Sequence, residues 1–203
     1  MKYLAIDTSS DYLCVVLCGG EKRYEYFSPD GKTRHSVSLM PAVDELFEKS
    51  GLKPSDLDYF CVVKGPGSFT GVRIGISTVK GFCYATKKPA LAVTAFDLCS
   101  YNDNVQKKLC VIDACHSHYY VCGFSGDNIS LSPRYVDDRE LKSLAEKYMV
   151  YSYSELCGVK SEKIDVVKGL IYAAEKYAER RSFEPETLSP RYLRLSQAEE
   201  GRK

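Results

Sequence analysis

The sequence lacks several features that would each point to one class of protein. No run of about 18 apolar residues occurs, so we expect no membrane-spanning helix. The first ten residues contain an acid, Asp7, and no long apolar stretch, which argues against a secretory signal peptide. Charge of one sign does not dominate either, because 28 basic residues face 27 acidic ones. The net charge of +1 argues against a protein that holds nucleic acid by its whole-surface field, although it leaves room for a local basic groove.

Cysteine is abundant, but the pairs typical of metal and redox sites are missing. The chain has nine cysteines, an odd number, and none of them forms a Cys-x-x-Cys pair. Most have apolar neighbours, as in Cys61-Val62-Val63. We therefore expect cysteine to act as a small core residue in a reduced, cytoplasmic protein with no disulfide framework.

Hydrophobic periodicity and turn residues divide the 203 residues into two similar halves. The first half is predicted to contain strands at 3–7, 12–18, 23–27, 58–64 and 89–94, with helices at 35–50 and 68–86, the second capped by Ser68. The second half is predicted to contain strands at 109–113, 118–124, 129–135 and 148–151, a helix opened by Asp137 with Glu140, and a helix at about 161–181.

The order of elements in the second half repeats that in the first. Aligning Asp7 with Asp113 also superimposes Ile6 on Ile112, Val15 on Val121 and Gly20 on Gly126. The repeat predicts a duplicated α/β protein whose two lobes each have a mixed sheet flanked by helices. We place the lobes at residues 1–101 and 102–203.

Asp7-Thr8-Ser9, at the end of the first predicted strand, is the first candidate site. A carboxylate and two hydroxyls on a tight turn could hold a nucleotide phosphate, with a metal ion on the aspartate. Asp and Ser also make turns simply by bonding their own backbone, and spacing alone favours this second interpretation.

The segment from Gly65 to Gly75, GPGSFTGVRIG, follows a strand and opens a helix. It is not a phosphate-binding P-loop, because no Gly-Lys-Ser/Thr follows, and the third glycine of the dinucleotide fingerprint would fall at Thr70. Glycine inside a helix costs about 1 kcal/mol relative to alanine. Gly71, Gly75 and Thr78 share one helix face, so the pattern favours close packing, within the chain or across a dimer, at least as much as ligand binding.

Recognisable catalytic groups are scarce. Cys115-His116-Ser117-His118 lacks the paired spacing of a zinc site and is interpreted as a polar hairpin turn, and no nucleophile elbow is present.

The last quarter of the chain is locally basic and contains Phe183 and Tyr192, which could contact RNA, but a solvated surface is the favoured interpretation. Its basic residues are Arg180, Arg181, Arg191, Arg194, Arg202 and Lys203.

These motifs together resemble the bacterial TsaB (YeaZ) family. The resemblance rests on Ile6-Asp7-Thr8-Ser9, Arg34-His35-Ser36 with Pro41, the glycine segment 65–75, Ile112-Asp113-Ala114 and Pro190-Arg191-Tyr192-Leu193-Arg194. It implies the duplicated actin-like (ASKHA) fold and a function that no motif shows by itself. That function is to support formation of the threonylcarbamoyl group on adenosine 37 of tRNAs that read codons beginning with A.

The resemblance also implies that the chemistry belongs to another subunit. The paralogous TsaD transfers the group, and TsaD-like proteins carry a metal-binding His-x-x-x-His where this chain has Ala95 and Cys99. We therefore expect a non-catalytic chain with no required cofactor, although ATP or ADP could lie at the partner interface. The family's second-lobe turn reads Asp-Ala-Arg, where this chain has Asp113-Ala114-Cys115-His116, so the role of that arginine is not carried over.

Two hypotheses follow from the sequence. In the first, the chain is a scaffold that pairs with a TsaD homologue, or with itself, alongside the ATPase TsaE, and meets tRNA mainly through the complex. The predicted contact residues are His35, Leu39, Val43, Ser68, Gly71, Val72, Gly75, Thr78 and Val79, and a bulky residue at Gly75 is expected to block pairing without unfolding the chain. The alternative is a nucleotide-dependent phosphotransferase of the same fold that uses Asp7, Thr8 and Ser9. Independent RNA binding by the basic C-terminal segment is a third possibility.

Overall fold

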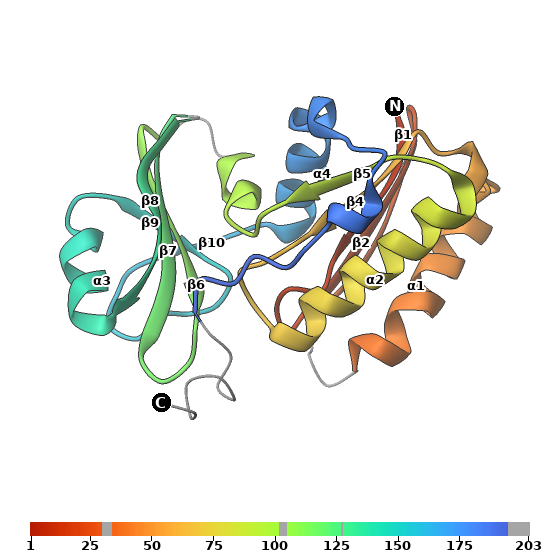
Figure 1. Cartoon of the computed structure of the whole chain (residues 1–203). Helices are drawn as coiled ribbons and strands as arrows, with labels where there is room; N and C mark the ends of the chain where they lie inside the picture. Colours follow the sequence, from red (N-terminus) through yellow and green to blue (C-terminus); the bar gives the residue numbers. More distant parts are fainter. Residues whose placement is uncertain (30–33, 102–104, 127, 195–203) are drawn as a thin grey trace.

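The computed structural model describes residues 1–29, 34–101, 105–126 and 128–194, which form two lobes side by side (Figure 1). Each lobe contains a mixed five-stranded sheet. The first sheet has the order β3-β2-β1-β4-β5, built from Lys2–Asp7 (β1), Leu13–Gly19 (β2), Arg23–Ser28 (β3), Tyr59–Val63 (β4) and Ala90–Val93 (β5). The second has the order β10-β9-β6-β7-β8, built from Lys107–Asp113 (β6), His118–Ser125 (β7), Asn128–Asp137 (β8), Met149–Ser152 (β9) and Glu162–Lys163 (β10). The predicted duplicated α/β fold is confirmed.

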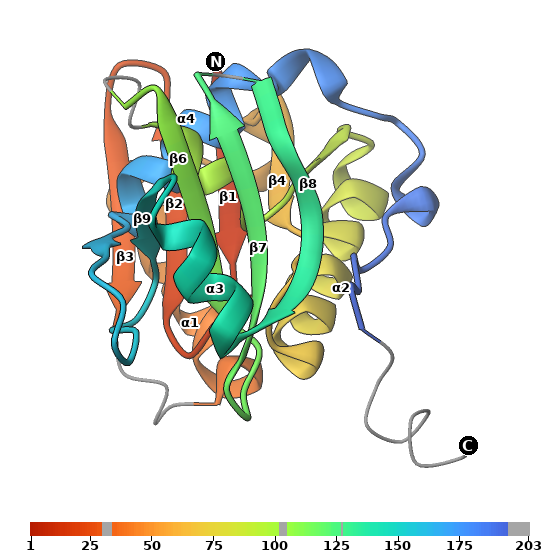
Figure 2. The ribbon, with the colours of Figure 1, turned by 90° about the vertical axis from the view of Figure 1, so that its left-hand side faces the viewer.

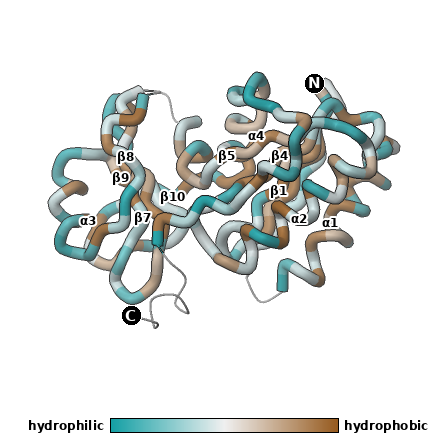
Figure 3. Tube along the Cα trace, in the orientation of Figure 1, coloured by the Kyte–Doolittle hydropathy of each residue, from teal (hydrophilic) through white to brown (hydrophobic). Residues whose placement is uncertain are grey.

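Helices cover both faces of the first sheet. His35–Ser50 (α1) and Phe69–Thr86 (α2) lie on one face, and Val166–Lys176 (α4) lies on the other (Figure 1). The alternation of side chains along β1 explains this arrangement, because Leu4 and Ile6 pack with α1 and α2 while Tyr3 and Ala5 pack with α4. Figure 3 shows the same sorting as apolar strands between helices of mixed polarity.

Among the described residues, one α-helix packs on the sheet of the second lobe, Asp138–Ala145 (α3) (Figure 2). Asp137 caps this helix as predicted, since its Oδ1 accepts the Glu140 N–H at 2.8 Å. Short 3₁₀ segments lie at Pro54–Asp56, Asp97–Tyr101, Ala178–Arg180 and Pro185–Thr187. No helix in the described ranges is long and apolar enough to span a bilayer.

The internal repeat holds in topology but not in the residue-by-residue alignment of its first hairpins. Ile6 pairs across the hairpin with Val15, whereas Ile112 pairs with Tyr120 and not with Val121. The first turn contains residues 8–13 and the second only residues 114–118, so the second hairpin is shorter by one residue. A shift of one residue sends side chains to opposite faces of a sheet, so the alignment of Val15 with Val121 is wrong.

The last helix differs from its prediction in length and in location. Residues 162–163 form a short strand, and α4 begins only at Val166, where Asp165 caps it by accepting the Lys168 N–H at 3.1 Å. The helix packs on the first sheet, where the Tyr59 hydroxyl donates to the Ala174 carbonyl at 3.0 Å. The division at residue 101 stays a prediction, but this helix from the second half covers the first-lobe sheet, whose central strands are apolar on both faces.

The chain after α4 first runs back along the first lobe and then reaches the second, where Arg194 donates to the Tyr135 hydroxyl of β8 at 3.0 Å. Ser182 and Ala90 exchange two backbone hydrogen bonds of 2.9 and 2.8 Å, and the Arg191 N–H donates to the Lys64 carbonyl at 2.7 Å. Seven of the nine cysteines are buried, as expected for core residues, while Cys115 and Cys157 are exposed.

Candidate functional site

The Asp7-Thr8-Ser9 turn lies buried where β1 ends, at the boundary between the lobes. The Asp7 carboxylate is fully buried and accepts two hydrogen bonds, from the Ser9 N–H at 2.8 Å and from the Tyr12 hydroxyl at 2.7 Å. Burial raises the pKa of Asp7 above its ordinary value, against the opposing effect of these two donors. Both carboxylate oxygens are thus used in holding the turn, which is what the turn interpretation predicts.

The glycine segment packs directly against this turn. The Ser68 N–H donates to the Ser9 carbonyl at 2.7 Å, and the Thr8 hydroxyl donates to the Gly71 carbonyl at 2.7 Å. A Cβ placed on Gly67 would lie 2.0 Å from the Ser9 carbonyl oxygen, and one on Gly71 would lie 2.0 Å from that of Thr8. The close approach predicted for these glycines is therefore with the chain's own β1 turn. With Asp7 and Thr8 occupied in this way, the structure gives the phosphotransferase hypothesis no support.

Gly75 continues the same contact and corrects one expectation. A Cβ at this position would lie 2.6 Å from the Thr8 Oγ1 and 3.3 Å from the Val62 side chain. A leucine at Gly75 would therefore disturb the packing of α2 on β1 and β4. This packing argues against the expectation that such a variant keeps its fold.

The residues predicted to meet a partner divide into two groups. Six belong to the inward face of the two helices and are buried within the chain: Leu39, Val43, Gly71, Val72, Gly75 and Val79. The other three are accessible, since Ser68 is exposed and His35 and Thr78 are half-buried. The Ser68 hydroxyl accepts the Gly71 N–H at 3.2 Å, which confirms the predicted cap. His35 donates from Nε2 to the Tyr12 carbonyl at 3.0 Å.

The outward face of α1 carries apolar residues that the sequence reasoning missed. Val37 and Met40 are 64% and 44% exposed, and Pro41 beside them is also exposed. Val37 lies about one helical turn before both Met40 and Pro41. Val37 and Pro41 lie opposite the buried stripe of α1, and Met40 lies at the edge of that stripe, next to Val43. We call Val37, Met40 and Pro41 the α1 outer patch. The signal was present in the sequence, because an apolar residue every three to four positions beyond the buried stripe marks a second face.

A cleft of about 490 Å³ separates the Asp7 turn from the matching turn of the second lobe. The two turns are built alike, because the Cys115 N–H donates to the Asp113 carboxylate at 2.8 Å, as Ser9 does to Asp7. Cys115, His116 and Ser117 all have positive φ angles of 55–64°. The sequence is thus a tight polar turn, as predicted, and the described residues contain no group of three or more His, Cys, Asp or Glu side chains arranged to hold a metal ion.

Part of the basic C-terminal segment is fixed against α2. The rings of Phe69 and Tyr192 stack at 4.9 Å, the Arg73 guanidinium lies 3.8 Å from the Phe69 centroid, and its Nε donates to the Tyr192 hydroxyl at 2.9 Å. This stack anchors the segment across the cleft. Arg202 and Lys203, also named as basic candidates, lie outside the described residues.

Because Asp7 is buried, its protonation should make stability depend on pH. The pKa is raised in the folded chain, so above the ordinary value of 3.8 the unfolded chain loses this proton more readily than the folded one. The free energy of unfolding should therefore fall, relative to an Asp7→Asn variant, as the pH rises from about 4 through the raised pKa of Asp7 toward 7. An asparagine can still accept from Ser9 and donate to the Tyr12 oxygen. Urea denaturation of both proteins across this range measures the effect.

The control is Asp113→Asn, which removes a carboxylate from an exposed position in the matching turn of the second lobe. A difference between the wild type and Asp7→Asn that stays constant with pH would contradict the buried, raised-pKa carboxylate.

Comparison with known proteins identifies the chain. Residues 29–138 match the family model described as "TsaD: tRNA N6-adenosine threonylcarbamoyltransferase". The tRNA threonylcarbamoyladenosine biosynthesis protein TsaB of Bacillus subtilis is 37% identical over 102 residues, which is 50% of this chain and 44% of that protein. TsaB of Haemophilus influenzae is 33% identical over 92 residues, 45% of this chain and 38% of its own length. The chain belongs to this family, in its TsaB (YeaZ) branch.

A solved structure of YeaZ from Pseudomonas aeruginosa agrees with this TsaB-type fold over almost the whole chain. It superposes with a TM-score of 0.76 at 21% identity and covers 95% of this chain and 99% of its own. The sequence match to the curated TsaB relatives spans less than half of their length. The resemblance stated from the sequence is thus confirmed for family and fold.

Proposed function

We propose that this chain is a TsaB-type subunit that acts with a TsaD homologue in placing threonylcarbamoyl on adenosine 37 of tRNAs reading codons that begin with A. The observation that carries the proposal is the family match together with relatives that are named for tRNA threonylcarbamoyladenosine biosynthesis. The net charge of only +1 gives this chain little whole-surface attraction for a tRNA. In this proposal most of the tRNA contact belongs to the rest of the complex.

A supporting rather than catalytic role fits the residues at the two positions where TsaD-like proteins have histidines. Ala95 has no ligating atom, and its N–H donates to the Gly65 carbonyl at 3.0 Å. Cys99 is fully buried in the core shared by both sheets. Neither residue can replace an imidazole at an accessible metal site, so in this proposal TsaD supplies the transfer chemistry.

The α1 outer patch is the surface we propose for the partner. The residues first assigned to the contact are mostly buried, whereas Val37 and Met40 on the same helix are exposed and apolar. An apolar centre on an otherwise polar helix face is typical of protein interfaces. The partner in this proposal is TsaD or a second copy of the chain, with TsaE joining the complex and ATP or ADP admitted at the interface.

Reconstitution of the modification tests the proposed function. A mixture of the organism's own TsaD, TsaE, the threonylcarbamoyl-adenylate donor and unmodified tRNA should modify adenosine 37 only when this chain is added, as read by mass spectrometry of the digested tRNA. Full modification without the chain would refute a supporting role. Modification by the chain without TsaD would show instead that it is itself the enzyme.

A further inference from the structure

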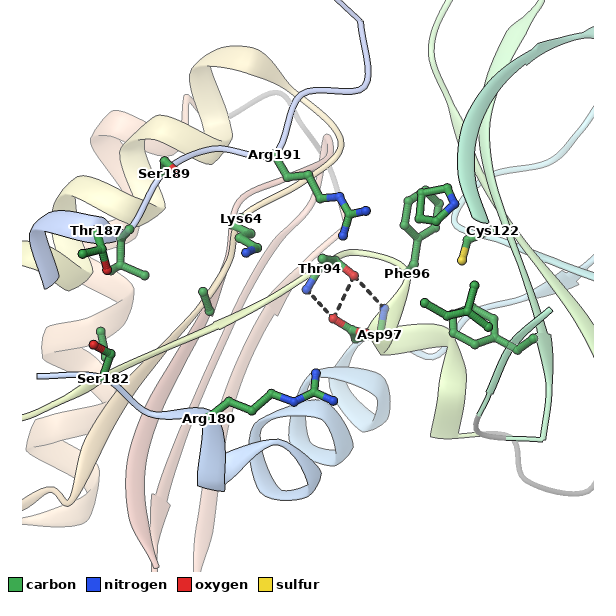
Figure 4. Close-up of a pocket in the computed structure, with 16 residues that line it drawn as sticks. Lys64, Thr94, Phe96, Asp97, Cys122, Arg180, Ser182, Thr187, Ser189 and Arg191 are labelled. Atoms are coloured by element: carbon green, nitrogen blue, oxygen red, sulfur yellow. Dashed lines mark hydrogen bonds between the residues drawn. The ribbon is translucent and has the colours of Figure 1, made fainter. Parts of the chain in front are cut away.

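A second cavity, of about 440 Å³, lies at the carboxyl ends of β4 and β5, facing strands β7 and β8 of the other lobe (Figure 4). It shares no lining residue with the cleft between the two aspartate turns. Its floor includes the small side chains of Ala90 and Ala92 on the edge strand β5, which leave room above them. The C-terminal segment closes one side. The described fold therefore contains a pocket that the proposed scaffold function does not use.

Positive charge is concentrated in this pocket. Lys64, Arg180 and Arg191 line it from three different segments, and Figure 4 shows their side chains extending toward the same space. None of the three belongs to the five ion pairs found among the described residues. The one carboxylate in the lining, Asp97, accepts from both the N–H (2.6 Å) and the hydroxyl (2.8 Å) of Thr94. Three cations therefore face one carboxylate, in a chain whose overall net charge is only +1.

Hydrogen bonds fix the backbone that carries these cations without any ligand. The Arg191 N–H donates to the Lys64 carbonyl at 2.7 Å, and the Ser182–Ala90 pair fixes the chain two residues after Arg180. The Arg180 guanidinium also lies over the Tyr177 ring, 4.0 Å from its centroid, and this cation–π contact restrains the side chain. Cations held around one pocket repel one another, and a bound anion would offset that repulsion.

The far wall of the pocket is apolar. Phe124 on β7 and Ile129 and Pro133 on β8 line the side that faces the cations across the cavity. Ile129 is 58% exposed, so it is available for contact. Burial raises the pKa of the neighbouring Cys122 thiol to about 12, which keeps it protonated beside a bound molecule. The pocket thus has one cationic and one apolar side.

We propose that this pocket binds a small organic phosphate, with the phosphoryl group against Lys64, Arg180 and Arg191 and the apolar part against Ile129 and Pro133. A phosphate monoester carries up to two negative charges and three acceptor oxygens, so it suits a pocket lined by three cations better than a carboxylate ligand, with its single charge, does. The pocket volume of about 440 Å³ leaves room for a ligand that has an organic part as well as a phosphoryl group. This inference does not depend on the proposed function.

Titration of the full-length chain with phenyl phosphate, inorganic phosphate and phenol, followed by NMR of the backbone amides, tests the two sides separately. Phenyl phosphate should saturate and bind about 10-fold more tightly than inorganic phosphate, because its ring buries apolar surface. The titration with phenol should not reach saturation, because phenol lacks the phosphoryl group. Shifts should centre on residues 64, 92–97 and 180–191.

Two kinds of variant locate the site. Arg180→Gln and Arg191→Gln, both at exposed positions, should each weaken phenyl phosphate about 10-fold through loss of a charge-assisted hydrogen bond. Ile129→Ser should weaken phenyl phosphate but leave inorganic phosphate unchanged. The control Arg139→Gln removes the same charge from an exposed site on α3 and should change neither affinity.

Other outcomes overturn the proposal. Wild-type protein that fails to saturate with phenyl phosphate, or Arg180→Gln and Arg191→Gln variants that bind like the wild type, would show that the pocket is not an anion site. Equal weakening by Arg139→Gln would show only general charge attraction. Saturable binding of a short RNA oligonucleotide, without binding of phenyl phosphate, would identify the cations as an RNA contact.

Discussion

Replacing Gly71 with alanine should destabilise the chain by about 3 kcal/mol or more, the upper end of what overpacking costs. The added methyl would lie 2.0 Å from the Thr8 carbonyl oxygen, far inside contact distance. Neither partner can yield easily, because Thr8 is held by β1 and by its own hydroxyl bond to the Gly71 carbonyl. The relief must therefore come from moving α2 away from the sheet, which opens the core around Ile6 and Val72.

The same helix supplies a matched control. Gly81 lies ten residues further along α2 on its exposed side, and a Cβ there would meet nothing within 4 Å. Gly81→Ala should stabilise the chain by up to about 1 kcal/mol, since alanine is the better helix former. Gly71→Ala gains the same propensity, so the difference between the two variants isolates the steric contact with Thr8.

Urea denaturation followed by circular dichroism at 222 nm measures both free energies of unfolding. Midpoints that move in opposite directions for the two variants, with unchanged slopes, are the expected result. Equal effects of the two substitutions would mean that Gly71 does not pack against the β1 turn. The contact between α2 and the Thr8 turn, as the structure has it, would then be wrong.

These glycines show what the sequence could and could not establish. Helix propensity alone marked Gly71 and Gly75 as costly and therefore in need of a packing reason. The identity of the packing partner, Thr8, depends on a contact between residues 63 positions apart, which no local pattern encodes. For the same reason the sequence did not distinguish the inward face of α1 from its outward face. The prediction therefore assigned Leu39 and Val43, which are buried, to the contact with a partner.

The last helix and the second pocket illustrate the same limit. An apolar face predicted a helix at about 161–181, of which residues 166–176 form one, but it did not indicate which of the two sheets that helix would cover. Lys64 lies more than 100 positions before Arg180 and Arg191 in the sequence, and the three line one pocket only because the C-terminal segment returns along β5. By contrast, the caps at Ser68 and Asp137 were predictable, because each uses a side chain three residues from its bond partner.

Reversing the polarity of the α1 outer patch should abolish pairing with the partner. If Val37 and Met40 lie at the centre of an interface with a TsaD homologue, Met40→Asp would bury an unpaired carboxylate there and weaken binding by at least about 30-fold, equivalent to about 2 kcal/mol at a central position. The double variant Val37→Asp/Met40→Asp should show no complex at micromolar concentrations. Since both side chains are exposed in the free chain, its stability should hardly change.

Met149→Asp is the matched control, because Met149 on β9 is 43% exposed against 44% for Met40 and lies on the other lobe. Isothermal titration calorimetry with TsaD gives the heterodimer affinity, and sedimentation of the chain alone shows whether the same patch forms a homodimer. Loss of both assemblies in Met40→Asp but not in Met149→Asp would mean that TsaD and a second copy compete for one surface. Unchanged TsaD affinity in the double variant would exclude the α1 outer patch, and the contact would then have to involve the accessible residues Ser68 and Thr78 at the edge of α2.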